Sequence, residues 1–119
     1  MSKQGLLLSN DLFFTSKITG TANALGFQVD VLGNAAGLAE RLAENNYVCI
    51  IVDLAFPAAD PEIIVAAAEN SSVESIIGYG PHVHHERLAQ AEAAGFTEVL
   101  SRGQFDANLA TILQTRLGE

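Results

Sequence analysis

An unbroken apolar segment lies near the middle of the chain, from Val48 to Val52, and it is rich in β-branched residues. A strand buried on one face only would alternate apolar and polar residues, so this uniform segment predicts a strand covered on both faces. Such strands occur in parallel sheets with helices on each side. Asp53 follows directly, and its carboxylate is expected at the carboxyl end of the strand, where ligands bind in open α/β sheets.

Shorter apolar segments on either side of this strand alternate with segments of helical periodicity. Further strands are expected at 5–8, 27–32, 76–77 and 96–100, and helices at about 14–25, 35–44, 61–70, 84–94 and 105–117. Strand and helix thus alternate throughout with short connections, which predicts an α/β fold with a parallel sheet, right-handed crossovers and helices on both faces.

Several residues are expected to begin or end these helices. Asn34 and Asp60 are suited to cap helices, with Pro61 in the first helical position, and Gly26 and Gly95 are suited to end them. Leu38, Ala39 and Leu42 are expected on the inner face of the 35–44 helix. The segment Gly78-Tyr79-Gly80-Pro81 follows the fourth strand and is interpreted as a tight turn or a place of close backbone packing, because it lacks the spacing of a phosphate-binding loop.

Composition narrows the classes of function. The 119 residues form a single domain, 1–119, that is 49% hydrophobic and 17% charged, as is typical of globular proteins. A net charge of −8 with only six Lys and Arg argues against binding to nucleic acid or anionic membranes. Cys49 is the only cysteine, so no disulfide forms within the chain, and no apolar segment has the length of a membrane helix or a signal peptide. A cytoplasmic location is expected.

Two sequence motifs, together with the order of the strands and helices, indicate a known family. Residues 53–60, DLAFPAAD, resemble the D-x-x-x-P-x-x-D pattern around the phosphoacceptor of bacterial response-regulator receiver domains. Residues 94–100, AGFTEVL, resemble the A-G-A-x-x-Y/F-L stretch leading into the fifth strand of the same family. The resemblance covers the whole chain and implies a flavodoxin-like, three-layer sandwich with a five-stranded parallel sheet and about five helices. It also implies a place in two-component signal transduction or a phosphorelay.

Receivers accept a phosphoryl group from a histidine kinase on the third-strand aspartate, with the help of Mg²⁺. The resemblance places the phosphoacceptor on Asp53 and the family's acidic pair on Ser9 and Asn10, with Asp11 one residue later. It places the hydroxyl residue of the family's switch on Gly80 and the aromatic residue of the switch on Val99. The family's lysine corresponds to Arg102. Mg²⁺ is a hard cation held by carboxylate oxygens and water, and each unit charge pair at 4 Å is worth about 4 kcal/mol at an effective dielectric of 20. With Ser9 and Asn10 in place of two carboxylates, Mg²⁺ binding is expected to be weak or absent.

These departures predict a receiver that has lost aspartyl phosphorylation, a pseudo-receiver without enzymatic activity that acts by protein–protein contact. Asp53 then remains as a structural acceptor, paired with Arg102 or bonded to loop amides. The resemblance implies partner contacts, and homodimerisation, through the face formed by the fourth helix, the fifth strand and the fifth helix. No cofactor is expected.

Two alternatives remain open. The first is an atypical but active phosphoacceptor that uses Asp53 with Asp11 and Arg102. The second is a small-ligand or metal-binding module at the loop that carries His82, His84 and His85, because clustered imidazoles bind Zn²⁺ or Ni²⁺. A hydrolase is not supported, since Ser9 is not part of a G-x-S-x-G elbow.

Overall fold

A five-stranded parallel sheet forms the middle layer of the computed structural model, which describes residues 3–56 and 59–118. The strands are β1 (Gln4–Leu8), β2 (Gln28–Leu32), β3 (Tyr47–Asp53), β4 (Ser75–Gly80) and β5 (Glu98–Ser101), in the spatial order β2-β1-β3-β4-β5. The chain therefore winds first towards one edge and then back towards the other, as in flavodoxin-like folds. Pro57 and Ala58 of the DLAFPAAD motif lie outside the described residues.

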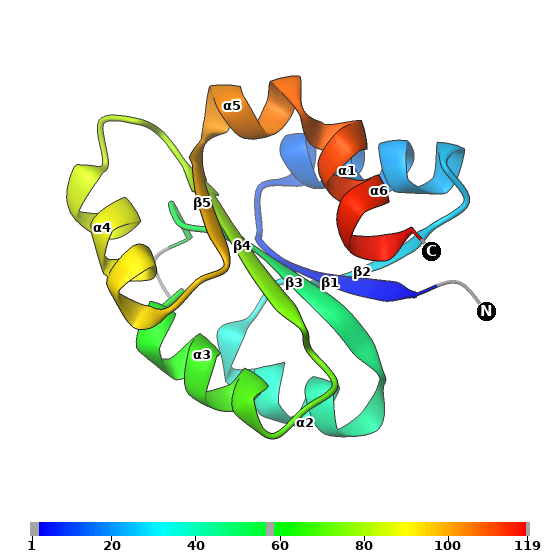
Figure 1. Ribbon diagram of the computed structural model, residues 1–119, viewed down its shortest axis with the longest axis horizontal. Coiled ribbons are helices and arrows are strands. Elements are labelled where there is room, and N and C mark those ends of the chain that lie inside the picture. The colour runs from blue at the N-terminus through cyan, green and yellow to red at the C-terminus, as the bar shows by residue number, and fades with distance from the viewer. Residues whose placement is uncertain (1–2, 57–58, 119) are drawn as a thin grey trace.

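Helices cover both faces of the sheet (Figure 1). They are α1 (Leu12–Ala24), α2 (Leu38–Glu44), α3 (Pro61–Glu69), α4 (His85–Ala94), α5 (Arg102–Ala107) and α6 (Leu109–Leu117), with a 3-10 turn, η1 (Ala35–Gly37), before α2. Figure 1 shows α1, α5 and α6 on one face and α2, α3 and α4 on the other. The three-layer α/β sandwich predicted from the sequence is confirmed.

The central strand β3 separates two hydrophobic cores. Ile50 and Val52 pack on the side of α2, α3 and α4, whereas Cys49 and Ile51 pack on the side of α1 and α6. All four side chains are at most 1% exposed. This is the burial on both faces that the uniform apolar segment predicts.

The predicted helix ends are confirmed as well. Asp60 caps α3 by accepting a hydrogen bond from the Glu62 amide at 3.0 Å, and Pro61 is the first helical residue. Gly26 and Gly95 adopt φ angles of +83° and +106° just after α1 and α4. A side chain is strained in this left-handed region, which is why glycine is favoured there.

Three sequence predictions need correction. The expected helix at 105–117 is two helices, and it begins earlier, because Ser101 and Gln104 form a capping box at the start of α5. Asn108 then interrupts it with φ −115° and ψ 15° and donates from its side-chain amide to the Gln104 carbonyl, a local bond that competes with helical hydrogen bonding. Leu38 and Leu42 of α2 are buried as predicted, but Ala39 is exposed.

The third correction concerns Gly78-Tyr79-Gly80, which is not a turn but the buried end of β4. Close packing does explain Gly78: a Cβ atom built there would lie 2.9 Å from the Phe96 ring and 3.0 Å from a Leu54 methyl carbon. Glycine is therefore required by the approach of these two side chains to the sheet.

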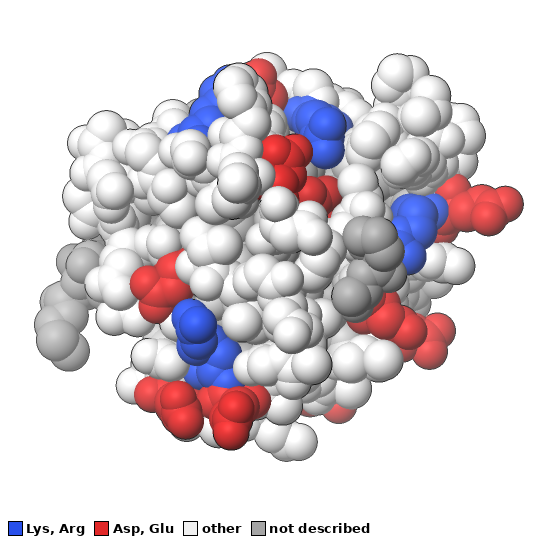
Figure 2. All heavy atoms as spheres, turned by 180° about the vertical axis from the view of Figure 1, so that it is seen from behind, with Lys and Arg blue, Asp and Glu red and all other residues white. Residues whose placement is uncertain are grey.

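Charged side chains are distributed in small groups over the surface. Figure 2, which shows the side opposite to Figure 1, has most Lys and Arg side chains next to Asp or Glu, with wide uncharged areas between them. Within the described residues, no helix combines the length and apolar character needed to cross a membrane.

Candidate functional site

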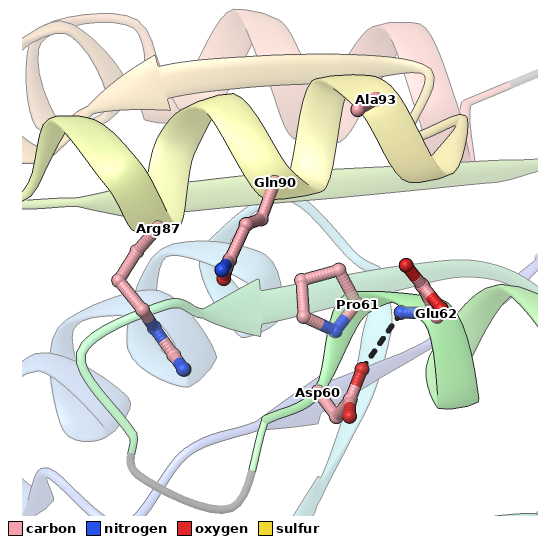
Figure 3. A pocket seen from close by; sticks show the side chains of 6 residues that line it. All are labelled: Asp60, Pro61, Glu62, Arg87, Gln90 and Ala93. Carbon is pink, nitrogen blue, oxygen red and sulfur yellow. Dashed lines mark hydrogen bonds between the residues drawn. The ribbon is translucent and has the colours of Figure 1, made fainter.

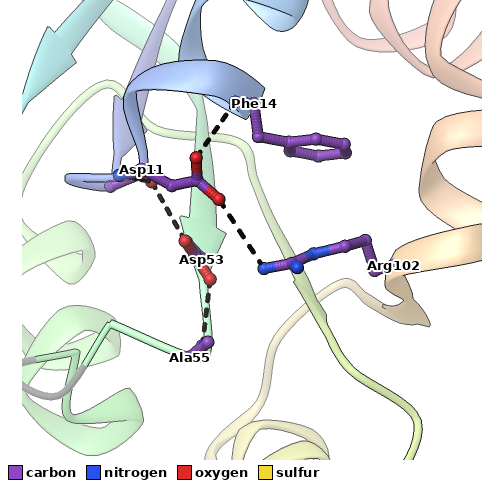
Figure 4. A network of polar contacts seen from close by, with 6 residues as sticks. Asp11, Phe14, Asp53, Ala55 and Arg102 are labelled. Atoms are coloured by element: carbon purple, nitrogen blue, oxygen red, sulfur yellow. Dashed lines mark hydrogen bonds and ion pairs between the residues drawn. The ribbon is translucent and has the colours of Figure 1, made fainter.

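Asp53 lies at the end of β3, at the carboxyl edge of the sheet, and is only 2% exposed. Its Oδ2 atom accepts a hydrogen bond from the Ser9 hydroxyl at 3.0 Å, and its Oδ1 atom accepts one from the Ala55 amide at 3.0 Å (Figure 4). The Phe56 amide also donates to the Asp53 carbonyl at 3.0 Å, which closes the turn after β3. Both carboxylate oxygens therefore have partners, and the predicted bonding of Asp53 to a loop amide is confirmed.

Ser9 connects the ends of two neighbouring strands. It follows β1, is 1% exposed, and accepts a hydrogen bond from the Asp11 amide at 3.1 Å while its hydroxyl donates to Asp53. A hydroxyl can donate and accept at once, whereas an ionised carboxylate only accepts. Ser9 thus gives the buried Asp53 carboxylate a neutral donor where a carboxylate would repel it. Asn10 is exposed.

Asp11 and Arg102 form an ion pair beside this buried contact. Asp11 caps α1, because its Oδ1 atom accepts from the Phe14 amide at 3.2 Å, and its Oδ2 atom lies 3.9 Å from Nη2 of Arg102. The Arg102 guanidinium lies over the Phe14 ring, 5.6 Å from its centroid. Of the two kinds of partner expected for Asp53, the structure shows the loop amide, whereas Arg102 pairs with Asp11 among the described residues. Arg102 is the first residue of α5 and not the last of β5, which turns it towards α1.

An aromatic cluster underlies the site and was not predicted. Tyr79 lies opposite Asp53 in the β3–β4 register and is fully buried. It stacks on Phe105, with ring centroids 4.5 Å apart and an interplanar angle of 15°, and it also contacts Phe14. Burial and the negative charge of Asp53 raise the pKa of Tyr79 far above its usual value, so its hydroxyl stays protonated. No sequence pattern indicated this role, because only the pairing of two distant strands brings Tyr79 to Asp53.

The two positions that correspond to the receiver switch lie on the other face of the sheet. Gly80 ends β4, and a Cβ atom there would lie 3.3 Å from Cβ of Leu54, closer than most such contacts. Val99 is half-buried and packs against the core on the side of α2, α3 and α4. A larger side chain at Gly80 would have to displace Leu54, so the packing here is adapted to glycine.

Arg87 holds the loop that follows Asp53, a role that was also not predicted. From α4, its Nε atom donates to the Leu54 carbonyl at 2.9 Å, and its Nη2 atom donates to the carbonyls of Phe56 and Ala59 at 3.0 Å each. Figure 3 shows Arg87 and Gln90 extending from α4 over a cavity of about 380 Å³, with Asp60 on its opposite side. The α4 helix is thereby connected to the segment that follows Asp53.

The three histidines do not converge. His82 lines a cavity that it shares with Arg102, whereas His84 and His85 line a different one. Over residues 3–56 and 59–118, no group of three or more His, Cys, Asp or Glu side chains is placed to hold a metal ion. Near Ser9, both carboxylate oxygens of Asp53 and Oδ1 of Asp11 accept hydrogen bonds, and Oδ2 of Asp11 is in the long ion pair with Arg102. These residues do not fit the coordination that a hard divalent cation requires.

A doubly wound sheet with a buried aspartate at the carboxyl end of its third strand is the architecture of receiver domains. The receiver domain of the sensor histidine kinase PA1611 from Pseudomonas aeruginosa PAO1, which has a magnesium ion coordinated in its active-site cleft, matches over 100% of both chains with a TM-score of 0.79 and 20% identity. A response-regulator receiver domain from Bermanella marisrubri matches over 98% of both chains with a TM-score of 0.81 and 18% identity.

The orphan response regulator HP1043 of H. pylori matches over 97% of this chain and 96% of its own, with a TM-score of 0.77 and 18% identity. No protein-family model matches the sequence, and no curated protein matches it. The chain therefore has the fold of a response-regulator receiver domain, as the sequence motifs predicted.

Proposed function

We propose that this chain is a receiver-like signalling module that acts by contact with protein partners and is not switched by Mg²⁺-dependent phosphorylation of Asp53. The observation that carries the proposal is the hydrogen bond from the Ser9 hydroxyl to Asp53. This hydrogen bond gives the buried carboxylate a donor without a metal ion. Ser9 also lies on the side of Asp53 where, by the resemblance to receivers, an acidic side chain is expected.

The electrostatics of phosphorylation support this proposal. A phosphoryl group adds negative charge, and receivers offset that charge with a metal ion and a cation. Here the neighbouring cation, Arg102, pairs with Asp11, and the Asp11 carboxylate also caps α1. The PA1611 domain holds magnesium in its cleft. We infer that the present chain differs from it because Ser9 and Asn10 bring no negative charge to the corresponding edge of the sheet.

Amide NMR titrations with Mg²⁺, and then with Mg²⁺ and beryllofluoride, test the proposal. The parent chain is expected to show no saturable shifts beyond those of an NaCl control at equal ionic strength. A Ser9→Asp, Asn10→Asp double variant places two carboxylates directly after β1, where the resemblance puts the acidic pair, and is expected to gain saturable shifts around residues 9–11 and 53. The matched control is the same double variant with Asp53→Asn, in which the gain is lost.

Phosphorylation is tested separately with a small phosphodonor and intact-protein mass spectrometry. We expect no stable adduct on the parent chain. Stoichiometric Mg²⁺-dependent modification that Asp53→Asn abolishes would overturn the proposal in favour of an atypical phosphoacceptor that uses Asp11 and Arg102.

We propose further that the partner surface is formed by α4, β5 and the last helical segment, α5 with α6, and that this face also supports a homodimer. Support comes from the resemblance to receivers and from the continuity of these elements along one edge of the sheet. Sedimentation equilibrium over a range of concentrations is expected to show a monomer–dimer equilibrium, with amide shifts on dilution confined to these elements. A monomer at all concentrations, or shifts elsewhere, would exclude this dimer.

A further inference from the structure

A second cavity opens beside the buried aspartate, between the start of α1, the segment after β4 and the start of α5. Its volume is about 500 Å³, and its lining includes Phe13, Phe14, His82 and Arg102. Small-molecule sites have volumes of about 300–1,000 Å³, with mainly apolar walls and a few polar groups that fix orientation. This cavity, which we call the α1–α5 cavity, combines both properties.

The guanidinium of Arg102 lies in this wall and makes a long ion-pair contact with Asp11. Its nearest ionic partner, Oδ2 of Asp11, lies 3.9 Å from Nη2, which is too far for a hydrogen bond, and the Arg102 side chain is 40% exposed. Two other charged groups of the wall, Lys17 and Asp106, form an ion pair with each other. The donor capacity left over at the α1–α5 cavity is therefore cationic and planar, which suits a carboxylate.

Aromatic surface lies next to this cation. Phe14 lies under the guanidinium, with 5.6 Å between its ring centroid and the Arg102 Cζ atom (Figure 4). Phe13 lines the same cavity and is 83% exposed, although it is a large apolar side chain. A planar apolar group that entered the cavity would cover Phe13 and remove apolar area from water.

From these observations we infer that the α1–α5 cavity binds a small aromatic carboxylate, whose carboxylate contacts Arg102 and whose ring packs against Phe13. Asp53 does not line this cavity, and the proposed binding requires no phosphorylation or metal ion. In a module whose proposed function excludes a phosphoryl signal, such a ligand would supply an input beside α1 and α5.

The test is an amide NMR titration of the intact chain with 2-naphthoate as the probe. We expect saturable shifts at Phe13, Phe14, His82 and Gly103 with a dissociation constant in the millimolar range or below. Titration with 2-naphthalenemethanol, which has the same ring without the charge, is expected to be at least about tenfold weaker, because the contact with Arg102 is charge-assisted.

Two variants and one control locate the binding. Arg102→Gln is expected to weaken 2-naphthoate binding about tenfold, and Phe13→Ser about threefold. The control Arg116→Gln removes an arginine that pairs with Glu98 on another surface, and it is expected to leave binding unchanged. Phe13 is exposed, so its variant still folds if Arg102→Gln does not.

Equal affinities for the charged and uncharged probes would overturn the inference, as would shifts that do not saturate or that map outside the α1–α5 cavity. Insensitivity of binding to Phe13→Ser would also overturn it. None of these outcomes affects the proposed loss of phosphorylation, which is measured at Asp53 with different probes.

Discussion

Ser9 and Asp53 form the contact on which the site is built, and its energetics are set by burial. Both side chains are at most 2% exposed, so neither has water to replace a lost partner. A buried acceptor left without a donor costs about 1–3 kcal/mol, and a second buried carboxylate at this position would also repel the first. The Ser9 hydroxyl therefore stabilises the Asp53 carboxylate, at a position where receivers have a phosphoacceptor that works with a metal ion.

Gly78 provides a test of packing at the same scale. Gly78→Ala is expected to lower the free energy of unfolding by about 1–3 kcal/mol, because the new Cβ atom would lie within 3.0 Å of Phe96 and Leu54. Gly20→Ala is the matched control: it lies within α1 with no atom near the new methyl group, and is expected to stabilise by about 1 kcal/mol. Urea unfolding measures both, and equal effects would contradict the packing argument.

Cys49 predicts a specific dependence on pH. Burial raises the pKa of its thiol from 9.0 to about 11, so the folded chain keeps the thiol neutral where the unfolded chain ionises it. The unfolded state then binds fewer protons between about pH 9 and pH 11, and stability falls as the pH rises through this window, by about 1.4 kcal/mol per unit at most. Urea unfolding at several pH values should give a steeper loss for the parent chain than for Cys49→Ala. Parallel curves would argue against this shift.

Arg87 acts at the scale of whole elements, because it joins α4 to the loop after β3. One guanidinium donates to three backbone carbonyls, those of Leu54, Phe56 and Ala59, and so adds to the hydrogen bonds that the loop makes within itself, such as the one from the Ala59 amide to the Phe56 carbonyl. The position of α4 and the path of the chain leaving Asp53 are thereby coupled. A signal that moved one of them would have to break or carry along these bonds.

The coupling is testable by substitution. Arg87→Gln is expected to lower the free energy of unfolding by about 1–3 kcal/mol and to accelerate hydrogen exchange of the Ala55 and Phe56 amides. Arg116→Gln, which removes an arginine paired with Glu98, is the control and should cost at most about 1 kcal/mol. If the hydrogen-exchange rates of these two amides were unchanged in Arg87→Gln, the loop would hold its shape without the Arg87 side chain.

The net charge of −8 acts on the whole molecule, whose radius of gyration is 12.8 Å. At an ionic strength of about 0.01 M the screening length is about 30 Å, so the excess acidic groups repel one another across the entire domain, whereas at about 0.15 M it is about 8 Å. Added salt is therefore expected to stabilise the fold, although ion pairs such as Lys17–Asp106 lose some attraction.

This expectation also distinguishes screening from metal binding. Raising NaCl from about 0.01 M to about 0.15 M should raise the thermal midpoint by roughly 4 °C, which corresponds to about 1 kcal/mol. MgCl₂ at the same ionic strength should give the same midpoint in calorimetry. A further rise that saturates with Mg²⁺ would indicate a specific site and would contradict the proposed loss of metal binding.

Local patterns in the sequence determined the elements and their order. The apolar segment before Asp53 predicted a strand buried on both faces, and Asp60-Pro61 and the glycines at 26 and 95 marked helix ends correctly. These features depend on neighbours in the chain, through periodicity, capping and backbone freedom, so they can be recognised without the fold. The resemblance of residues 53–60 to the receiver motif pointed to Asp53, which is buried at the end of β3.

Contacts between distant segments were decided by the tertiary structure alone. The hydrogen bond from Ser9 to Asp53 spans 44 positions, and Arg87 reaches carbonyls about 30 residues earlier in the chain. Whether Arg102 paired with Asp53 or with Asp11 depended on the start of α5, which a capping box moved to residue 102. The sequence determines which side chains are present, but the parallel strands bring them together only when the sheet has formed. The register between neighbouring strands then sets which donor meets which acceptor.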